Sequence, residues 1–304
     1  MNARGLRGSL VPYERTPGRI RFLLLGDSIV FGYGVGQDET LGERLADTLR
    51  KDGLPAEVIN SGVPAYSIEE EIAFLELDGI RYRPDYVILG FCWNDLNDNH
   101  GIRVSSEGWL VSAAQGDGPA SHPLWETPAT YELRNLVKRS RIAYTAMTGL
   151  RSVQENLWPD SHYLFRKSVL EGMQTQAIVQ AWERVARNVR RLQELSVQHG
   201  FRVLVVALPL PLALEADFPR SSYPKSLAEI AAREGVPFLD LQGSFRGAFR
   251  GHDSLFIPYD ADHPNGAGHA LAAASIRDYL EKNGGLALLI SSVRHRPSFP
   301  DTPR

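Results

Sequence analysis

A serine, an aspartate and a histidine carry the most informative chemistry in this sequence. Ser28 closes the run Leu25-Gly26-Asp27-Ser28, and His263 lies 235 residues later, with Asp260 three residues before the histidine. In a Ser-His-Asp hydrolase the histidine takes the hydroxyl proton, and the aspartate orients the imidazole through its other nitrogen. An imidazole suits this task because its unperturbed pKa, near ~6.5, lies close to neutral pH. We therefore predict Ser28 as nucleophile, His263 as base and Asp260 as the residue that orients it.

Each of these residues also has an ordinary structural interpretation. The Ser28 hydroxyl could cap the helix that it opens. The segment from Asp260 to His263 could be a turn before a helix, with Asp262 as the N-terminal charge. His269 is a second candidate base, although its place inside an amphipathic helix is more typical of packing.

An acyl-transfer enzyme also needs donors for the oxyanion. Candidates are the Ser28 backbone N–H, a backbone N–H in the turn 60–65, and the side-chain amide of Asn94. Asn94 could instead stabilise a turn at the end of a strand. Cys92 precedes it by two residues and is the only cysteine, which excludes an internal disulfide. Cys92 is an alternative nucleophile, but the absence of a neighbouring histidine favours a small apolar filler.

Apolar runs and helical spacing predict the elements that position these residues. Strands are expected over 21–25, 57–60, 85–91, 201–208 and 237–241, and helices over 40–52, 67–77, 176–199, 226–234 and 266–282. Strands that alternate with helices predict an α/β fold with a parallel sheet covered on both faces. Ser28, the turn 60–65 and Asn94 come after three successive strands. Sites in such sheets form outside the carboxyl ends of the strands, so these groups are expected to meet at one edge.

The stretch 97–175 interrupts this rhythm, because connections in α/β units usually have ~2–6 residues. It holds a helix-like segment over 133–150 with a basic side. Two interpretations are open: an insertion helix packed on the core, or a lid that shapes the substrate site.

Composition limits the class of protein and its partners. The 304 residues are 43% hydrophobic and 23% charged, as in soluble globular proteins, with a formal net charge of −3. This charge gives no general attraction to nucleic acid or to an anionic membrane surface. No transmembrane segment is apparent, and the chain as written is expected to be cytoplasmic. We predict an N-terminal extension over 1–20, one domain over 21–290 that contains the insertion 97–175, and a disordered tail over 291–304.

Four short blocks resemble those of the SGNH hydrolases, also called the GDSL esterase/lipase family. The blocks are Leu25-Gly-Asp-Ser28, Val58 to Ser67, Trp93-Asn-Asp95 and Asp260 to Asn265, in the family's order. The resemblance implies a flavodoxin-like three-layer α/β/α fold with a five-stranded parallel sheet. It also implies ester hydrolysis through an acyl-Ser28 intermediate, without a cofactor or metal. Asn94 and a backbone N–H of the second block would complete the oxyanion hole.

The sequence departs from this family pattern at two positions. The glycine of the second block aligns with Ala65, and Gly62, three residues earlier, is the second choice for the backbone donor. Ala65 keeps this role only if its φ is negative or the strain is tolerated. Cys92 stands where the third block usually has glycine. Both changes add bulk near the site and favour a short acyl group.

The long insertion resembles that of larger bacterial members, often secreted or membrane-anchored, that act on acylated sugars. The residues after Met1 resemble the segment next to such an anchor, so the protein is extracytoplasmic if an anchor has been removed. We therefore expect a serine esterase acting on a small-molecule or carbohydrate ester; the sequence carries no signal for an oligomeric state. The alternatives are an acyltransferase with the same site, a catalytically weak binding module, and a nucleotide-binding domain. The loop after the first strand lacks the glycines and lysine of a P-loop, which argues against the nucleotide-binding domain.

Overall fold

The computed structural model describes residues 1–96, 102–104, 110–112, 161–214, 223–258, 260 and 262–286. The chain divides into two compact units, 1–96 with 169–304, and 97–168. The predicted helix over 133–150 and the predicted tail over 291–304 lie outside the described residues. The predicted insertion 97–175 begins at the same residue as the second unit, and its role as a lid stays a prediction.

A five-stranded parallel sheet forms the centre of the first unit, as the sequence predicts. Along the sheet the strands are β2 (Ala56–Asn60), β1 (Ile20–Gly26), β3 (Tyr86–Phe91), β6 (Arg202–Ala207) and β7 (Phe238–Asp240). Every residue of β1 and β3 is buried, because helices cover both faces. The register places Gly26 opposite Gly90, so β1 and β3 reach the carboxyl edge of the sheet together.

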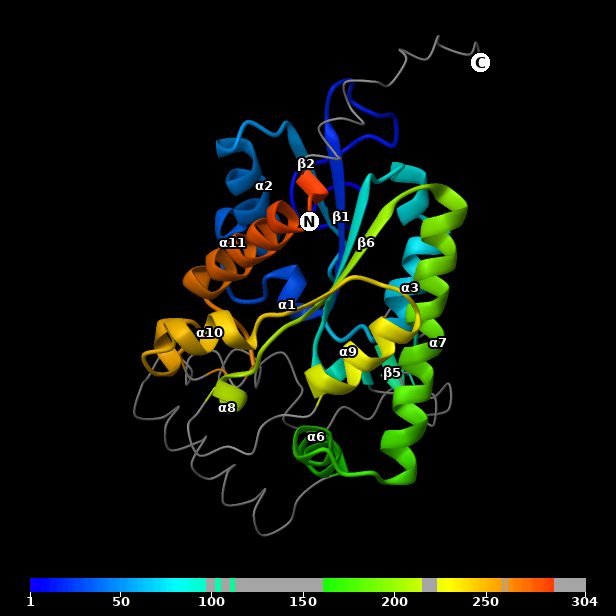
Figure 1. Cartoon of the computed structure of the whole chain (residues 1–304), viewed down its shortest axis with the longest axis vertical. Helices are drawn as coiled ribbons and strands as arrows, with labels where there is room; N and C mark the ends of the chain where they lie inside the picture. The colour runs from blue at the N-terminus through cyan, green and yellow to red at the C-terminus, as the bar shows by residue number, and fades with distance from the viewer. Residues whose placement is uncertain are drawn as a thin grey trace. The chain divides into compact units, whose positions relative to one another are not determined.

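Helices on the two faces complete a three-layer α/β/α arrangement (Figure 1). One face carries α2 (Leu41–Lys51) and α11 (Gly266–Lys282), which pack against one another. The other carries α3 (Ile68–Leu77), α7 (Gln176–His199) and α9 (Tyr223–Arg233). Their buried residues recur at helical spacing, as Leu41, Leu45 and Leu49 do in α2. None of the helices that the structure describes is long and apolar enough to cross a bilayer.

Shorter elements connect these layers, and apart from the helix that Ser28 opens the sequence pattern did not predict them. In the first unit they are α1 (Ser28–Phe31), η1 (Gln37–Glu39), η2 (Gly79–Tyr82), η3 (Trp93–Leu96), α8 (Pro211–Leu214), α10 (Gln242–Ala248) and η6 (His252–Ser254). In the second unit β4 (Ile102–Val104) and β5 (Leu110–Ser112) form an antiparallel hairpin. Helix α6 (Ser161–Glu171) begins in that unit.

The N-terminal segment lies against the edge of the sheet. Leu6 is buried, and Arg7 forms an antiparallel bridge with Asn60 at the end of β2. The buried guanidinium of Arg21 donates to the carbonyl oxygens of Tyr13 and Glu14. Residues predicted as an extension thus contribute buried contacts to the first unit.

Candidate active site

The end of β1 delivers Ser28 to the carboxyl edge of the sheet. A Cβ on Gly26 would lie 2.2 Å from Val30 Cγ2, so glycine lets α1 begin directly after the strand. Asp27, and not Ser28, caps this short helix, because its Oδ1 accepts from the Ile29 N–H at 2.8 Å. The Ser28 hydroxyl is therefore not needed as a helix cap.

The structure brings Ser28, His263 and Asp260 together in one chain of hydrogen bonds. His263 Nε2 lies 2.8 Å from Ser28 Oγ, and His263 Nδ1 lies 2.8 Å from Asp260 Oδ1. Asp260 Oδ1 also accepts the backbone N–H groups of Asp262 and His263, each at 2.9 Å. These bonds hold the carboxylate on the ring side of the turn. The next helix, α11, is capped by Asn265, which accepts from the N–H groups of its first turn.

The surroundings of His263 favour the protonated imidazolium. Burial lowers the pKa of His263, but the hydrogen bond to Asp260 and the charges of Asp260, Asp262 and Asp27 outweigh it and leave the pKa raised above 6.5. For Asp260, burial raises the pKa, while the hydrogen bonds from His263 and from backbone N–H groups lower it below its usual value. An imidazolium formed when Ser28 loses its proton is thus stabilised in place.

Asn94 lies in the turn η3 that comes after β3. Its Nδ2 donates to Asp27 Oδ2 at 2.8 Å, which ties this turn to the residue before Ser28. Asp27 is buried, and burial raises the pKa of its carboxyl group against the lowering effect of the Ile29 N–H and the Asn94 amide. An amide nitrogen carries two hydrogens, so Nδ2 keeps one to donate to an oxyanion.

The turn after β2 contains both candidates for the backbone donor. The Gly62 N–H already donates to Asn60 Oδ1 at 3.0 Å, and a Cβ there would lie 2.3 Å from the Phe31 nitrogen. Ala65 is exposed and is the third residue of a turn closed by the bond from Tyr66 N–H to the Val63 carbonyl. Its φ is 68°, in the left-handed region that favours glycine. The condition of negative φ fails, and Ala65 holds a strained conformation. Neither residue is assigned as a donor by these contacts.

Two other residues considered from the sequence are buried. Burial, reinforced by the charges of Asp27, Asp95 and Asp262, raises the pKa of the Cys92 thiol well above its usual range. A buried neutral thiol is a poor nucleophile. His269 is 2% exposed in α11, and burial lowers its pKa to about 4, so it packs as a neutral ring near pH 7.

Tyr33 belongs to the site, although the sequence did not single it out. Its ring centre lies 4.8 Å from that of His263, and 47% of its surface is exposed. It comes after Gly32, which ends α1 in the left-handed conformation. The tyrosine therefore provides an exposed aromatic face next to the proposed base.

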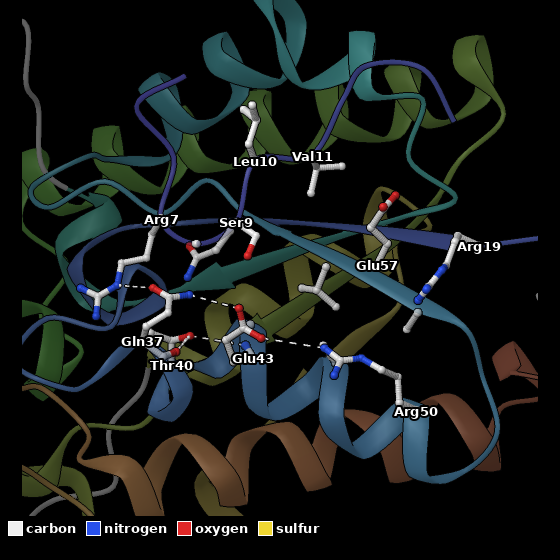
Figure 2. Close-up of a pocket in the computed structure, with 16 residues that line it drawn as sticks. Arg7, Ser9, Leu10, Val11, Arg19, Gln37, Thr40, Glu43, Arg50 and Glu57 are labelled. Carbon is white, nitrogen blue, oxygen red and sulfur yellow. Dashed lines mark hydrogen bonds and ion pairs between the residues drawn. The ribbon is translucent and has the colours of Figure 1, made fainter. Parts of the chain in front are cut away.

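A separate cavity of about 520 Å³ lies beside the edge strand β2, between α2 and residues 7–11 (Figure 2). Figure 2 shows Arg7, Gln37, Glu43 and Arg50 linked along it, with Arg7 to Gln37 at 3.1 Å and Gln37 to Glu43 at 3.2 Å. None of Ser28, Asp260 and His263 lines this cavity. Within the described part of the chain, no group of three or more His, Cys, Asp or Glu side chains is arranged to hold a metal ion.

Comparison with known proteins gives a family match and likenesses in fold. The model of the GDSL-like lipase/acylhydrolase family matches residues 24–271. The solved structure of TesA is 14% identical with a TM-score of 0.50, covering 86% of this chain and 98% of that one. The acetyl xylan esterase AlAXEase is 13% identical with a TM-score of 0.50, and the match covers 86% of this chain and 100% of that one. LAE5, an alpha/beta hydrolase from the metagenome of Lake Arreo, is 17% identical with a TM-score of 0.50, and the match covers 90% of this chain and 98% of that one. These likenesses show the fold; no curated protein matches the sequence.

Proposed function

The chain belongs to the GDSL-like lipase/acylhydrolase family of carboxylic ester hydrolases, and on that premise we propose that it is a serine esterase with Ser28 as nucleophile. The observation that carries this proposal is the pair of 2.8 Å hydrogen bonds from Ser28 through His263 to Asp260. In this arrangement Nδ1–H of His263 donates to Asp260, and the unprotonated Nε2 faces the hydroxyl. Ser28 and His263 are therefore set for proton transfer before a substrate binds.

In the first half of the reaction, Ser28 Oγ forms a bond to the ester carbonyl carbon while His263 Nε2 takes the hydroxyl proton. The carbonyl oxygen becomes an oxyanion. Its proposed donors are the Ser28 N–H, the Asn94 amide and a backbone N–H of Ala65, with Gly62 as second choice. The tetrahedral intermediate collapses when the bond to the alcohol oxygen breaks and that oxygen takes the proton from His263. Acyl-Ser28 remains.

In the second half, water replaces the alcohol. His263 takes a proton from the water as its oxygen attacks the acyl carbon, and then returns that proton to Ser28 Oγ as the bond to serine breaks. The products are a carboxylic acid and free enzyme. Asp260 stays ionised throughout and stabilises the imidazolium in both halves.

For the substrate we propose a short acyl group on a small alcohol or a sugar. Ala65 and Cys92 stand where the family pattern has glycine, and their larger side chains are the reason for proposing a short acyl group. The exposed ring of Tyr33 beside His263 offers a flat apolar surface to the alcohol part as it leaves. The likeness in fold to an acetyl xylan esterase supports an acetylated carbohydrate as substrate.

Hydrolysis of p-nitrophenyl esters from acetate to long-chain acyl groups, by the wild type and by Ser28→Ala, tests both the nucleophile and the preference for a short acyl group. We expect acetate to be cleaved faster than octanoate, and Ser28→Ala to lose nearly all activity while keeping its fold by circular dichroism. Full activity in folded Ser28→Ala would refute the mechanism. A preference for long chains would refute only the short-acyl proposal.

A further inference from the structure

Helix α3 buries a carboxyl group in its apolar stripe. Ile68, Glu71, Ile72 and Leu75 occupy the buried face at helical spacing, and Glu71 is only 2% exposed. Among the described residues, neither carboxyl oxygen of Glu71 has a basic, amide or hydroxyl donor. A buried glutamate of this kind must find another partner or lose its charge.

The partner is the carboxyl group of Asp95 in the turn η3. Asp95 is 1% exposed, and its Oδ2 accepts the Cys92 N–H at 2.5 Å. Its Oδ1, like both carboxyl oxygens of Glu71, is buried with no other partner among the described residues, and the two carboxyl groups lie close enough for the charge of Asp95 to raise the pKa of Glu71. Two ionised carboxylates have only acceptors, so a hydrogen bond between them requires one proton. We place this proton on Glu71, because Asp95 already accepts a backbone N–H as a carboxylate would.

The electrostatics of the surroundings agree with this placement. Burial, with the charges of Asp95 and Asp27 next in size, raises the pKa of Glu71 well above its ordinary range. Burial and the charge of Asp27 also raise the pKa of Asp95 well above its ordinary range, but the Cys92 N–H and Glu71 act against that rise, which makes Asp95 the member of the pair that keeps its charge. Of the described charged groups around the pair, Asp27 before α1 and Glu70 on α3 are acidic, whereas Arg184 on α7 is basic and donates to the Leu96 carbonyl at the end of the turn η3. An ionised Glu71 would add a further negative charge to this buried group. A neutral Glu71 donates a hydrogen bond and adds none.

The pair adjoins the proposed oxyanion donor along the chain. Asn94 is the neighbour of Asp95 in the four-residue turn Trp93–Leu96. Asp95 closes the start of this turn through the Cys92 N–H, and Arg184 donates to the Leu96 carbonyl at its end, at 3.0 Å. The amide of Asn94 itself is held by Asp27. The orientation of Asn94 therefore depends on where Asp95 is held.

We propose that Glu71 is a positioning residue for ester hydrolysis: as a neutral acid it donates to Asp95, and so holds the turn Trp93–Leu96 with the Asn94 amide directed at the oxyanion. This inference rests on the proposed role of Asn94. Glu71 does not touch the substrate.

The first test compares Glu71→Leu, which fills the space without a donor, with Glu71→Gln, which keeps a neutral N–H donor. Glu71→Leu is expected to lower kcat by at least about tenfold. The loss should not exceed the about 10²- to 10³-fold effect of removing an oxyanion donor outright. KM should change little, and Glu71→Gln should restore most of the rate. Glu69→Gln, the same chemical change at a half-buried position of α3, is the control. Wild-type kcat in folded Glu71→Leu, or an equal loss in Glu71→Gln, would overturn the proposal.

A double-mutant cycle separates positioning from general damage. If Glu71 acts through Asn94, then Glu71→Leu causes no further loss of kcat in an Asn94→Ala background. If the two losses multiply, Glu71 acts elsewhere and the proposal fails.

The shared proton can be measured without any activity, and with Glu71→Gln even if Glu71→Leu does not fold. Glu71 is ionised in the unfolded chain above about pH 4.3 but neutral in the folded one, so folding takes up a proton. Above about pH 5.5, and up to the raised pKa of Glu71 in the folded protein, the unfolding equilibrium constant of the wild type should therefore rise about tenfold more per pH unit than that of Glu71→Gln. Parallel curves would show that no proton is held there and would overturn the inference. Because this readout does not use esters, its failure is distinct from a failure of the proposed esterase function.

Discussion

At the scale of single residues, the position of one carboxylate decides how His263 is oriented. Asp260 Oδ1 accepts three N–H groups, two from the backbone of its own turn and one from the imidazole. The backbone bonds fix the carboxylate, and the fixed carboxylate selects the tautomer with hydrogen on Nδ1. Ser28 then faces the nitrogen that can accept its proton.

The raised pKa of His263 sets the pH dependence of activity. Only the neutral imidazole accepts the Ser28 proton, so kcat/KM on a neutral ester should rise with pH along a limb whose midpoint lies above 6.5. In Asp260→Asn the carboxylate that raises this pKa is absent while burial still lowers it, so the midpoint should move to lower pH and the maximal rate should fall. A pH–rate profile of both proteins measures this. An unmoved midpoint, or a damaging Asp262→Asn beside a silent Asp260→Asn, would contradict the assignment.

The proposed donor Asn94 gives a second prediction at this scale. Asn94→Ala should reduce kcat by about 10²- to 10³-fold, as expected for the loss of one oxyanion donor. KM should change little, because the bond strengthens only in the transition state. Steady-state kinetics, with the folded fraction measured by circular dichroism, provide the check. Normal specific activity in the folded fraction would make Asn94 a purely structural residue.

At the scale of elements, the turn after β2 has glycine at one position where packing requires it, and alanine at another where the backbone conformation favours glycine. Gly62 allows close approach to α1, where a Cβ would lie 2.3 Å from the Phe31 nitrogen. Ala65 occupies a left-handed position with φ of 68° that glycine would adopt without strain. The turn thus keeps its packing glycine but carries backbone strain at the proposed oxyanion edge.

Replacing that alanine should relieve the strain. An alanine in the left-handed region destabilises the folded protein by about 1–2 kcal/mol. Glycine removes that strain but costs about 0.4–1 kcal/mol, because it increases the conformational entropy of the unfolded chain. Ala65→Gly should therefore raise the free energy of unfolding by about 0.5–1 kcal/mol, measured by urea denaturation at constant m-value. Destabilisation would mean that the Ala65 methyl makes contacts worth more than its strain.

Elements with strong periodicity and clear caps could be predicted from the sequence. The helices 176–199 and 266–282 have the predicted bounds, because Gly200 ends the first and Asn265 caps the second. The seven-residue helix α10 and the three-residue strands of the hairpin escaped, because they are too short to establish a period.

The candidate site could be predicted only in part. Ser28, His263, Asp260 and Asn94 belong to recognisable blocks, but Tyr33 does not, and its position depends on how the chain leaves α1. Glu71 did leave a signal, since it interrupts the apolar stripe of Ile68, Ile72 and Leu75. An acidic residue on the buried face of a helix predicts a buried partner, and Asp95 fills that place.

At the scale of the whole molecule, the parallel sheet gathers residues from distant parts of the chain at one edge. Residues 28 and 263 come within hydrogen-bond distance across 235 positions, and Tyr33 lies beside them. The aromatic face next to His263 is available to the alcohol part of a substrate, which allows selection of the alcohol to be tested apart from the chemistry.

Tyr33→Ala should therefore lower kcat/KM for an acetylated sugar more than for p-nitrophenyl acetate, whereas Tyr33→Phe, which keeps the ring, should retain the wild-type ranking. Competition between the two substrates measures the ratio directly. An equal loss on both substrates in Tyr33→Ala would assign Tyr33 to His263 orientation instead of alcohol binding.

The most direct measurement of the central claim is the site of covalent modification by a fluorophosphonate probe, mapped by peptide mass spectrometry. The probe transfers its phosphonyl group to a serine only where a base removes the hydroxyl proton. We predict a single adduct on Ser28, lost in Ser28→Ala and strongly slowed in a folded His263→Ala variant. An adduct on Cys92 or on another serine, or no adduct on a folded protein that hydrolyses esters, would contradict this prediction.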